Sequence, residues 1–393
     1  MTVSFTPEKP LKYGCNPHQL PASICSVDGM RMPIQVLNGT PGYINYLDAI
    51  NAWGLVKELK AGTGLPAAAS FKHVSPAGAA VAVPLTDVEK KAFEITADYT
   101  GVTLAYVRAR NADPLCSFGD YVAVSDPVDD ALAEVLRTAV SDGIVAPDFS
   151  PTVLEVLKKK SGGFVVIKAD PTAPLPDLEV RTCGGVGLVQ KRNDAVFTKE
   201  HCADVKTKTP LSPDAIRDCI VASIAVKYTQ SNSVGYAKNG MMLGVGAGQQ
   251  SRVDCVKLAG RKTAKCYLMQ HPKVLNLPFK TEGVKKQERV NARVAYIEGD
   301  MTTIEKESWL KNFTSEPEPL TEGEKAEFVK TLSGVTISSD AFFPFRDSID
   351  HAARFGVSFV VQPGGSVQDA EVTEACDQYG MAMCHTKLRL FHH

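Results

Sequence analysis

The sequence predicts an α/β protein in three layers, with helices packed on a sheet, and two kinds of pattern lead to this prediction. Short β-branched runs at 163–167 and 357–361, bounded by chain-breaking residues, are typical of buried strands. Segments whose apolar residues recur every three or four positions lie between such runs and are typical of amphipathic helices. Alternation of this kind favours helices layered on a sheet.

The helix expected over 212–226 has the clearest boundary signals. Ser212 suits the N-cap because its hydroxyl can accept a backbone hydrogen bond, and Pro213 suits the first helical position. The apolar residues expected on its inward face are Ile216, Cys219, Ile220 and Ile224.

Signals of the same kind predict two further helices. Ser366 is expected to cap a helix that has Asp369 in its first turn and a left-handed stop at Gly380. Asp126 and Pro127 are expected to open another helix. Its inward residues are expected to be Leu132, Val135, Leu136 and Ala139.

Two stretches of the chain resemble each other weakly. Residues 120–126 precede a helix and the run 144–147, and residues 340–347 precede a helix and the run 359–363, with spacings that differ by one residue. This similarity predicts two alike subdomains. We place them at 1–208 and 209–393, because a Lys/Thr-rich stretch comes before the well-capped helix at 212.

Composition narrows the functional classes. The chain has 393 residues, 44% of them hydrophobic and 22% charged, which predicts two or three packed units. A net charge of −1 leaves no electrostatic footprint for nucleic acid. The polar N-terminus and the lack of any run of about 18 apolar residues predict neither a secretion signal nor a membrane span. The 10 scattered cysteines form no CxxC pair, which indicates reduced thiols in a cytoplasmic protein.

The segment 70–78 puts a lysine beside a histidine before a Pro/Gly turn. The charge of Lys72 favours a neutral imidazole at His73, which can then accept a proton. The alternative is an ordinary solvated basic pair in a loop, and this fragment taken alone favours the alternative.

Three more segments either line a site or form simple turns. Residues 227–234 crowd polar side chains after a capped helix, among them Asn232. Residues 244–252 alternate glycines but lack the GxGxxG pattern of a dinucleotide loop. Near the C-terminus, Arg389 offers a guanidinium fork suited to phosphate, although a purification tag is an alternative explanation of the last two histidines.

Taken in order, these motifs resemble the AICAR (aminoimidazole-carboxamide ribotide) transformylase domain at the C-terminal end of bifunctional purine-biosynthesis enzymes. The resemblance runs from near the first residue to the last. The matching segments are Tyr13–Gln19, Leu37–Lys57, Ser70–Val81, Ser117–Asp120, Val140–Ile144, Val226–Tyr236, Gly246–Arg252, Ser338–Asp347 and His385–His393.

The resemblance implies two cytidine-deaminase-like α/β subdomains, a homodimer with active sites at the subunit interface, and no zinc. It implies transfer of a formyl group from 10-formyltetrahydrofolate to the 5-amino group of AICAR, in purine (IMP) biosynthesis. The family's IMP cyclohydrolase activity belongs to a separate N-terminal domain. Because 393 residues leave no room for that domain, we expect a transformylase without cyclohydrolase.

The same resemblance assigns roles to residues. His73 is the base at the amine, Lys72 either stabilises the oxyanion or protonates N10, and Asn232 holds the formyl oxygen or the amine. Nucleotide binding is implied for Lys12, Tyr13, Gly119, Asp142, Arg252, Phe342 and Arg389, and folate binding for Val253 and Phe342. Lys12 stands where the family usually has arginine, so a bidentate fork is missing there.

The family also carries a potassium ion, which the resemblance places on a set of oxygen-bearing positions. They are Val226, Thr229, Ser231, Ser233, Asp340, Leu390 and His392. Carbonyl and hydroxyl oxygens form such cages, and one carboxylate balances the charge. The alternative for Asp340 is a simple turn cap, as it is for Asp142.

Three other functions compete with this interpretation. An ATP- and formate-dependent formylation of AICAR is disfavoured because no GxxxxGK[ST] phosphate loop occurs. A non-catalytic nucleotide-binding subunit is disfavoured by the intact Lys72–His73 pair. A zinc deaminase is disfavoured because neither HxE with PCxxC nor HExxH occurs.

Overall fold

The computed structural model describes residues 2–160 and 162–393. The chain begins with the hairpin β1 (Phe5–Leu11) and β2 (Ala22–Val27). The next elements are β3 (Ile34–Asn38), α1 (Tyr43–Thr63), β4 (Ala67–Lys72), β5 (Ser75–Val81), α2 (Asp87–Phe93), α3 (Gly101–Ala112), β6 (Asp120–Val124), α4 (Asp130–Thr138), β7 (Ser141–Ala146), α5 (Pro151–Lys158) and β8 (Val165–Ala169).

A second hairpin, β9 (Leu178–Cys183) with β10 (Val186–Lys191), and the short 3-10 helix η1 (Lys199–Cys202) lead into the rest of the chain. There follow α6 (Pro213–Lys227), β11 (Val234–Lys238), β12 (Met241–Gly246), α7 (Arg252–Leu268), α8 (Pro272–Leu275), α9 (Lys286–Glu298), α10 (Thr303–Leu310), α11 (Glu322–Lys330), β13 (Val335–Ser339), α12 (Asp347–Ala353), β14 (Val357–Gln362), α13 (Asp369–Gln378) and β15 (Ala382–His385).

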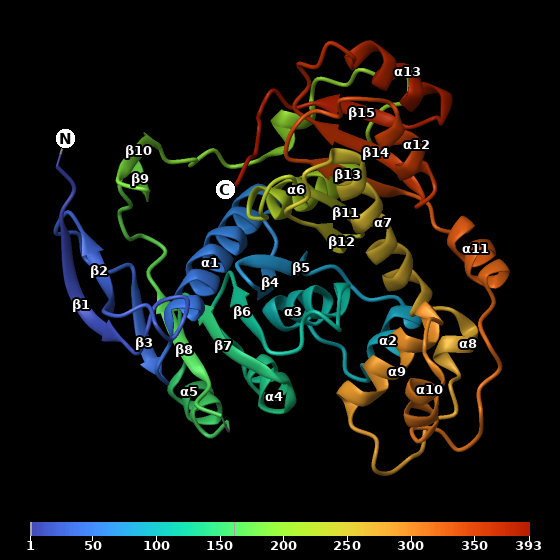
Figure 1. Cartoon of the computed structure of the whole chain (residues 1–393), viewed down its shortest axis with the longest axis horizontal. Coiled ribbons are helices and arrows are strands. Elements are labelled where there is room, and N and C mark those ends of the chain that lie inside the picture. The colour runs from blue at the N-terminus through green and yellow to red at the C-terminus, as the bar shows by residue number, and fades with distance from the viewer. Residues whose placement is uncertain (1, 161) are drawn as a thin grey trace.

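One 11-stranded sheet runs through the molecule in the order β15-β14-β13-β11-β12-β5-β4-β6-β7-β8-β3 (Figure 1). It contains two series of five strands with the same topology. In the first series, β4 pairs antiparallel with β5 and with β6, while β6, β7 and β8 run parallel. In the second series, β11 pairs antiparallel with β12 and with β13, while β13, β14 and β15 run parallel. The two series meet where β5 pairs antiparallel with β12.

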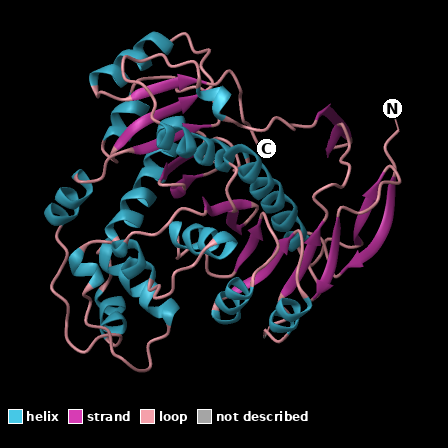
Figure 2. Cartoon of the chain, turned by 180° about the vertical axis from the view of Figure 1, so that it is seen from behind, coloured by secondary structure: helices cyan, strands magenta, loops and turns pink. Residues whose placement is uncertain are grey.

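Helices cover both faces of this sheet, so the predicted α/β fold in three layers is confirmed (Figure 2). On one face, α1 and α6 pack side by side. On the other face lie α3, α4, α5, α7, α12 and α13. Strand residues alternate between the two cores, as in β6, where Val122 and Val124 face one and Tyr121 and Ala123 face the other. The boundary predicted between 208 and 209 lies in the segment between η1 and α6 and stays a prediction.

The predicted helix at 212–226 is confirmed as α6, and the Ser212 hydroxyl accepts a hydrogen bond from the Ala215 amide as expected of an N-cap. The other two helix starts were wrong. Helix α13 begins at Asp369 because the Ser366 hydroxyl instead accepts from the Gln368 amide, within a turn before the helix. Helix α4 begins at Asp130 because Asp129, not Asp126, supplies the cap.

The weak similarity between 120–126 and 340–347 was aligned incorrectly. In the sheet, β6-α4-β7 corresponds to β13-α12-β14, but Asp120 opens β6 whereas Asp340 follows β13. By register, the counterpart of Asp340 is Ser125, since the Ser125 amide donates to the Ala67 carbonyl at the start of β4 and the Asp340 amide donates to the Ser233 carbonyl just before β11.

Between α7 and β13, the second series carries an insertion that forms a small core of its own. Residues from α8, α9 and α10 pack there around Trp309 and Tyr296, whose rings stack at 6.0 Å. None of the helices in the described part of the chain has the length and apolar character needed to cross a membrane.

Candidate active site

The turn between β4 and β5 carries the predicted Lys72–His73 pair on an unusual backbone. Lys72 pairs with Ser75 across the hairpin, so His73 and Val74 alone make the turn. Their φ angles are both positive, 52° and 60°. Two-residue hairpin turns favour positive φ at both positions, and Asn-Gly is the usual pair for them. For a β-branched residue such as Val74 a positive φ is an outlier that costs about 1–3 kcal/mol, and such strain gathers at functional sites.

The Lys72 side chain crosses from the hairpin to the starts of β6 and β7. Its Nζ donates a hydrogen bond to the Gly119 carbonyl at 2.6 Å. A Cβ atom on Gly119 would lie 3.1 Å from this Nζ and 3.6 Å from Asp142 Oδ1, so the glycine leaves room for both groups. Burial raises the pKa of Asp142, and the nearby Lys72 charge opposes that rise. The structure therefore brings together Lys72, His73, Gly119 and Asp142, which we name the Lys72 cluster.

A buried polar network lies under the Lys72 cluster. Asp120 is fully buried and accepts hydrogen bonds from Ser70 Oγ at 2.7 Å, Arg110 Nη1 at 2.8 Å and Ser141 Oγ at 2.5 Å. These bonds tie the first residues of β6 and β7 to β4 and α3, so they hold Gly119 and Asp142 in place. Sequence patterns do not predict this network, because its members lie far apart in the chain.

A second group of predicted residues gathers where β11 begins and β12 ends. Arg252, at the start of α7, donates to Asn232 Oδ1 at 2.8 Å, to the Ser233 carbonyl at 3.0 Å and to the Asp340 carboxylate. Arg252 is buried and Asp340 is fully buried, so each neutralises a charge that would otherwise be costly. We name Asn232, Arg252 and Asp340 the Asn232 cluster.

The C-terminal residues close over the Asn232 cluster. The Leu390 amide donates to the Asp340 carbonyl at 2.8 Å, and Ser231 exchanges two bonds with His392, at 2.9 and 3.0 Å. Burial lowers the pKa of His392. Ser233 Oγ donates to the Val226 carbonyl at 3.0 Å, and Thr229 lies one turn away, its hydroxyl bonded to the Ala225 carbonyl at 2.7 Å. All seven positions predicted for potassium thus lie in one neighbourhood.

Three further predicted ligand-binding residues lie near the Asn232 cluster in the chain, or near the C-terminal residues that close over it. Val253 adjoins Arg252 on α7, and exposed Phe342 follows Asp340 in the loop after β13. Arg389 is exposed and lies over the Phe391 ring at 4.7 Å.

Lys12 and Tyr13 follow β1, next to the end of the sheet opposite β13–β15 (Figure 1). Lys12 Nζ lies 5.9 Å from the Tyr13 ring centre. Neither residue has a hydrogen bond to the Lys72 cluster or to the Asn232 cluster within the described ranges.

The two clusters share one edge of the sheet. Strand directions put the β4–β5 turn, the starts of β6 and β7, the start of β11 and the ends of β12 and β13 at that edge. Strands β5 and β12 separate the clusters, and among residues 2–160 and 162–393 no hydrogen bond or ion pair joins them. The chain therefore presents both clusters at the same edge of the sheet.

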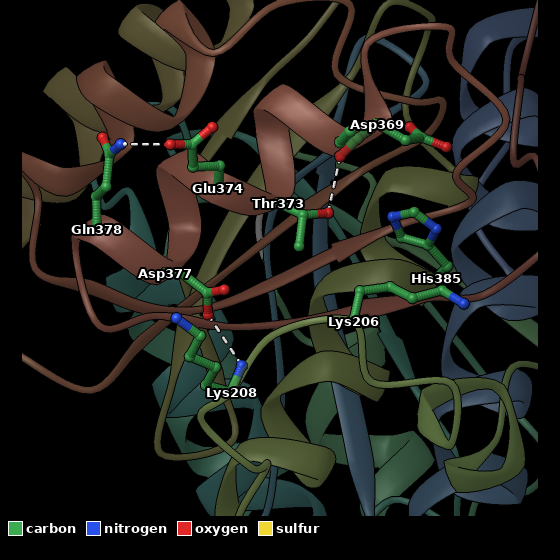
Figure 3. A pocket seen from close by; sticks show the side chains of 9 residues that line it. Lys206, Lys208, Asp369, Thr373, Glu374, Asp377, Gln378 and His385 are labelled. Atoms are coloured by element: carbon green, nitrogen blue, oxygen red, sulfur yellow. Dashed lines mark hydrogen bonds between the residues drawn. The ribbon is translucent and has the colours of Figure 1, made fainter.

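An open cavity of about 860 Å³ lies away from both clusters, between α13 and the segment that precedes α6 (Figure 3). Its lining residues are Lys206, Lys208, Asp369, Ala370, Thr373, Glu374, Asp377, Gln378 and His385, none of which was predicted for the site. Lys206 pairs with Asp204 at 2.7 Å, and Asp377 accepts from the backbone amide of Lys208 at 2.9 Å. We assign no chemistry to it.

Comparison with known proteins gives consistent matches. Residues 1–262 match the family model described as AICARFT/IMPCHase bienzyme. The chain is 32% identical over 391 residues to the bifunctional purine biosynthesis protein PurH of Roseobacter denitrificans, and 31% identical over 387 residues to the protein of the same name from Aquifex aeolicus. Each match covers 98% of this chain and 59% of the relative, so the chain spans under two thirds of the length of these curated relatives.

Proposed function

Because this chain belongs to the AICARFT/IMPCHase bienzyme family, we propose that it transfers the formyl group of 10-formyltetrahydrofolate to the 5-amino group of AICAR. The products are formyl-AICAR and tetrahydrofolate, and the reaction belongs to purine biosynthesis. The observation that carries this proposal is the Lys72–His73 pair, held on a strained turn beside Gly119 and Asp142.

The reaction needs two proton movements around one tetrahedral centre. The amine nitrogen bonds to the formyl carbon, the carbonyl electrons move to oxygen, and the amine proton goes to the exposed imidazole of His73. When the oxyanion collapses, the bond from carbon to N10 breaks and N10 takes up a proton. Lys72 either stabilises the oxyanion or supplies the N10 proton. Its ammonium suits both roles because, among the described residues, one of its three N–H donors is used, by the Gly119 carbonyl.

The amide nitrogen of Asn232 is a donor that can bind the formyl oxygen as that oxygen becomes an oxyanion. Asn232 is half-buried, and its amide oxygen accepts from Arg252. Among the described residues, its amide nitrogen has one long bond of 3.3 Å, to the Gln250 carbonyl, so it can be redirected to a ligand. Loss of a donor of this kind to a developing oxyanion costs about 2.7–4 kcal/mol of barrier. For the nucleotide we propose Lys12, Tyr13, Gly119, Asp142, Arg252, Phe342 and Arg389, and for folate Val253 and Phe342.

We propose that a homodimer completes each site, with the Lys72 cluster of one subunit facing the Asn232 cluster of the other. The support is that the two clusters do not contact each other within the described part of one chain. The proposal is tested by mixing His73→Asn protein with Asn232→Ala protein after subunit exchange. Recovery of activity in the mixture is expected, and two inactive parents that stay inactive would contradict a shared site.

We also propose potassium beside the Asn232 cluster. The neighbourhood holds hydroxyl and carbonyl oxygens from Val226, Thr229, Ser231 and Ser233, a donor set that fits a monovalent cation. The bound cation would hold this loop and the C-terminal residues together. Exchange of potassium for lithium is expected to lower the melting temperature, and an unchanged temperature would contradict the proposal.

The activity itself is tested by mixing the protein with AICAR and 10-formyltetrahydrofolate and following both products. Equal amounts of tetrahydrofolate and formyl-AICAR are expected, without IMP, because we also propose that this chain lacks cyclohydrolase activity. Product formed only when ATP and formate replace the folate would favour a ligase instead. His73→Asn is the matched inactive control, since asparagine tolerates positive φ and keeps the turn.

A further inference from the structure

The carboxylate of Asp48, on α1, lies under the strained turn and belongs to no predicted site. Its Oδ1 accepts a hydrogen bond from the Val74 amide at 2.7 Å, and the side chain is only 6% exposed. This is a bond between residues far apart in sequence, from the helix on one face of the sheet to the tip of the β4–β5 hairpin.

The surroundings of Asp48 connect it to the Lys72 cluster. Burial raises the pKa of Asp48 above its ordinary value, while the Val74 amide and the charges of His73 and Lys72 lower it and Asp142 raises it. The hydroxyl of Tyr121 also faces this group, is buried, and has no partner in the described ranges. Tyr46, on α1, is a further titratable group here, and it neighbours Tyr121.

The second series of strands contains a natural comparison. Asp218 lies at the same position in α6 as Asp48 does in α1, the sixth residue of its helix. It accepts from the amides of both turn residues of the β11–β12 hairpin, Asn239 at 2.8 Å and Gly240 at 2.6 Å, and it also pairs with Arg217 at 3.1 Å. Both carboxylate oxygens of Asp218 therefore have hydrogen-bond donors. In Asp48 one oxygen has the Val74 amide, and no donor to the other oxygen occurs among the described residues.

We propose that Asp48 is a positioning residue for the Lys72–His73 pair: it holds the left-handed turn through the Val74 amide and presents its negative charge to His73 and Lys72. The inference rests on the proposed function and deepens it. In proton transfer, a carboxylate often lies beside the basic side chain and orients it. Its negative charge favours the charged form of that side chain as the proton arrives. A role in the turn alone, like that of Asp218, is the competing explanation.

Two substitutions separate the charge from the hydrogen bond. Asp48→Asn keeps an oxygen that can accept from Val74 but removes the charge, and Asp218→Asn is the matched control in the other hairpin. We expect Asp48→Asn to lower kcat by at least about tenfold, to leave KM for AICAR nearly unchanged, and to move the acid side of the kcat–pH profile to lower pH. Asp218→Asn should leave all three unchanged.

A measurement independent of activity keeps this inference distinct from the proposed function. In protein labelled with 15N-valine, the Val74 amide signal, assigned with Val74→Ala, is expected to shift with pH as the Asp48 carboxylate titrates, and to stop doing so in Asp48→Asn. A Val74 signal insensitive to pH would overturn the contact even if formyl transfer is confirmed. An unchanged kcat and profile in folded Asp48→Asn would overturn the role of the charge.

Discussion

The β4–β5 and β11–β12 hairpins occupy the same place in the two series of strands, yet their turns are built from different residues. The first turn is Lys72-His73-Val74 and the second is Lys238-Asn239-Gly240. Their φ angles are nearly alike, 52° and 60° against 52° and 71°. Both turns therefore need positive φ at two successive residues, and only the second turn has the residue types that such turns favour.

This difference shows where the fold gives up stability. Asn and Gly adopt positive φ at low cost, whereas the β-branched Val74 is strained there. The first turn keeps the less suitable residues beside Gly119 and Asp142, at the edge where the predicted site residues gather. The second turn instead contacts buried Arg108, whose Nη2 donates to the Asn239 carbonyl at 2.7 Å. We infer that the shape of the first turn serves chemistry and that the shape of the second turn serves packing.

The largest difference in kcat is expected between substitutions of Lys72 and Lys238, the lysines that precede the two turns. Lys72→Met should reduce kcat by about 10²–10³, the usual effect of losing one group that stabilises the oxyanion. Lys238→Met should leave kcat within about twofold, since Lys238 ends β11 at the edge of the sheet opposite the two clusters. Steady-state formyl transfer measures both, and equal losses would remove the functional distinction between the hairpins.

A smaller but clear effect on stability is expected from Gly240→Val, which puts the Val74 side chain type into the second turn. The new Cβ would lie 2.8 Å from the Cγ2 atoms of both Val81 and Val83, at a φ that L-residues rarely adopt. We expect a loss of at least about 2 kcal/mol in the free energy of unfolding, measured with urea. A neutral result would show that the second turn tolerates strain as readily as the first.

The reverse change, Val74→Gly, should stabilise the protein. Glycine relieves the positive-φ strain but loses more backbone entropy on folding. We expect a net gain of about 0.5–1 kcal/mol in the free energy of unfolding. Urea unfolding tests the gain, and the same protein should show a lower kcat because the turn is freer. Higher stability together with full activity would mean that the strain has no part in the function.

The smallest effect concerns pH. Burial raises the pKa of Asp218, so the folded protein binds this proton more tightly than the unfolded chain does. Stability from this group is present below the ordinary aspartate value and is lost as pH rises through the raised value. Asp218→Asn should therefore flatten the fall in stability across that window, in melts from pH 3 upward by about one-unit steps. A steeper fall of stability with pH in Asp218→Asn than in the unchanged protein would contradict this prediction.

Local patterns predicted the fold better than the site. Helix α6 was predicted correctly because Ser212 and Pro213 signal its start within a few residues. The start of α13 was predicted wrongly because the Ser366 hydroxyl accepts a hydrogen bond within a turn and does not cap the helix. The predicted site residues came from the family resemblance. The Asp48–Val74 bond and the Asp120 network were missed because they join distant segments.

One sequence signal for Asp48 does exist. The pattern D-x-I-x-A-x-x-x-V-K occurs at Asp48–Lys57 and again at Asp218–Lys227. These two stretches lie in the corresponding helices α1 and α6, so an internal alignment on this pattern pairs Asp48 with Asp218 and the two hairpins that follow.

The most direct test of the central claim compares His73→Asn with Asn239→Ala in the formyl transfer assay. Asparagine keeps the positive-φ turn at 73, so only the imidazole is lost. We expect His73→Asn to lose about 10²-fold or more in kcat while it still binds AICAR, and Asn239→Ala to keep its kcat. Full turnover by a folded His73→Asn protein would rule out His73 as the base.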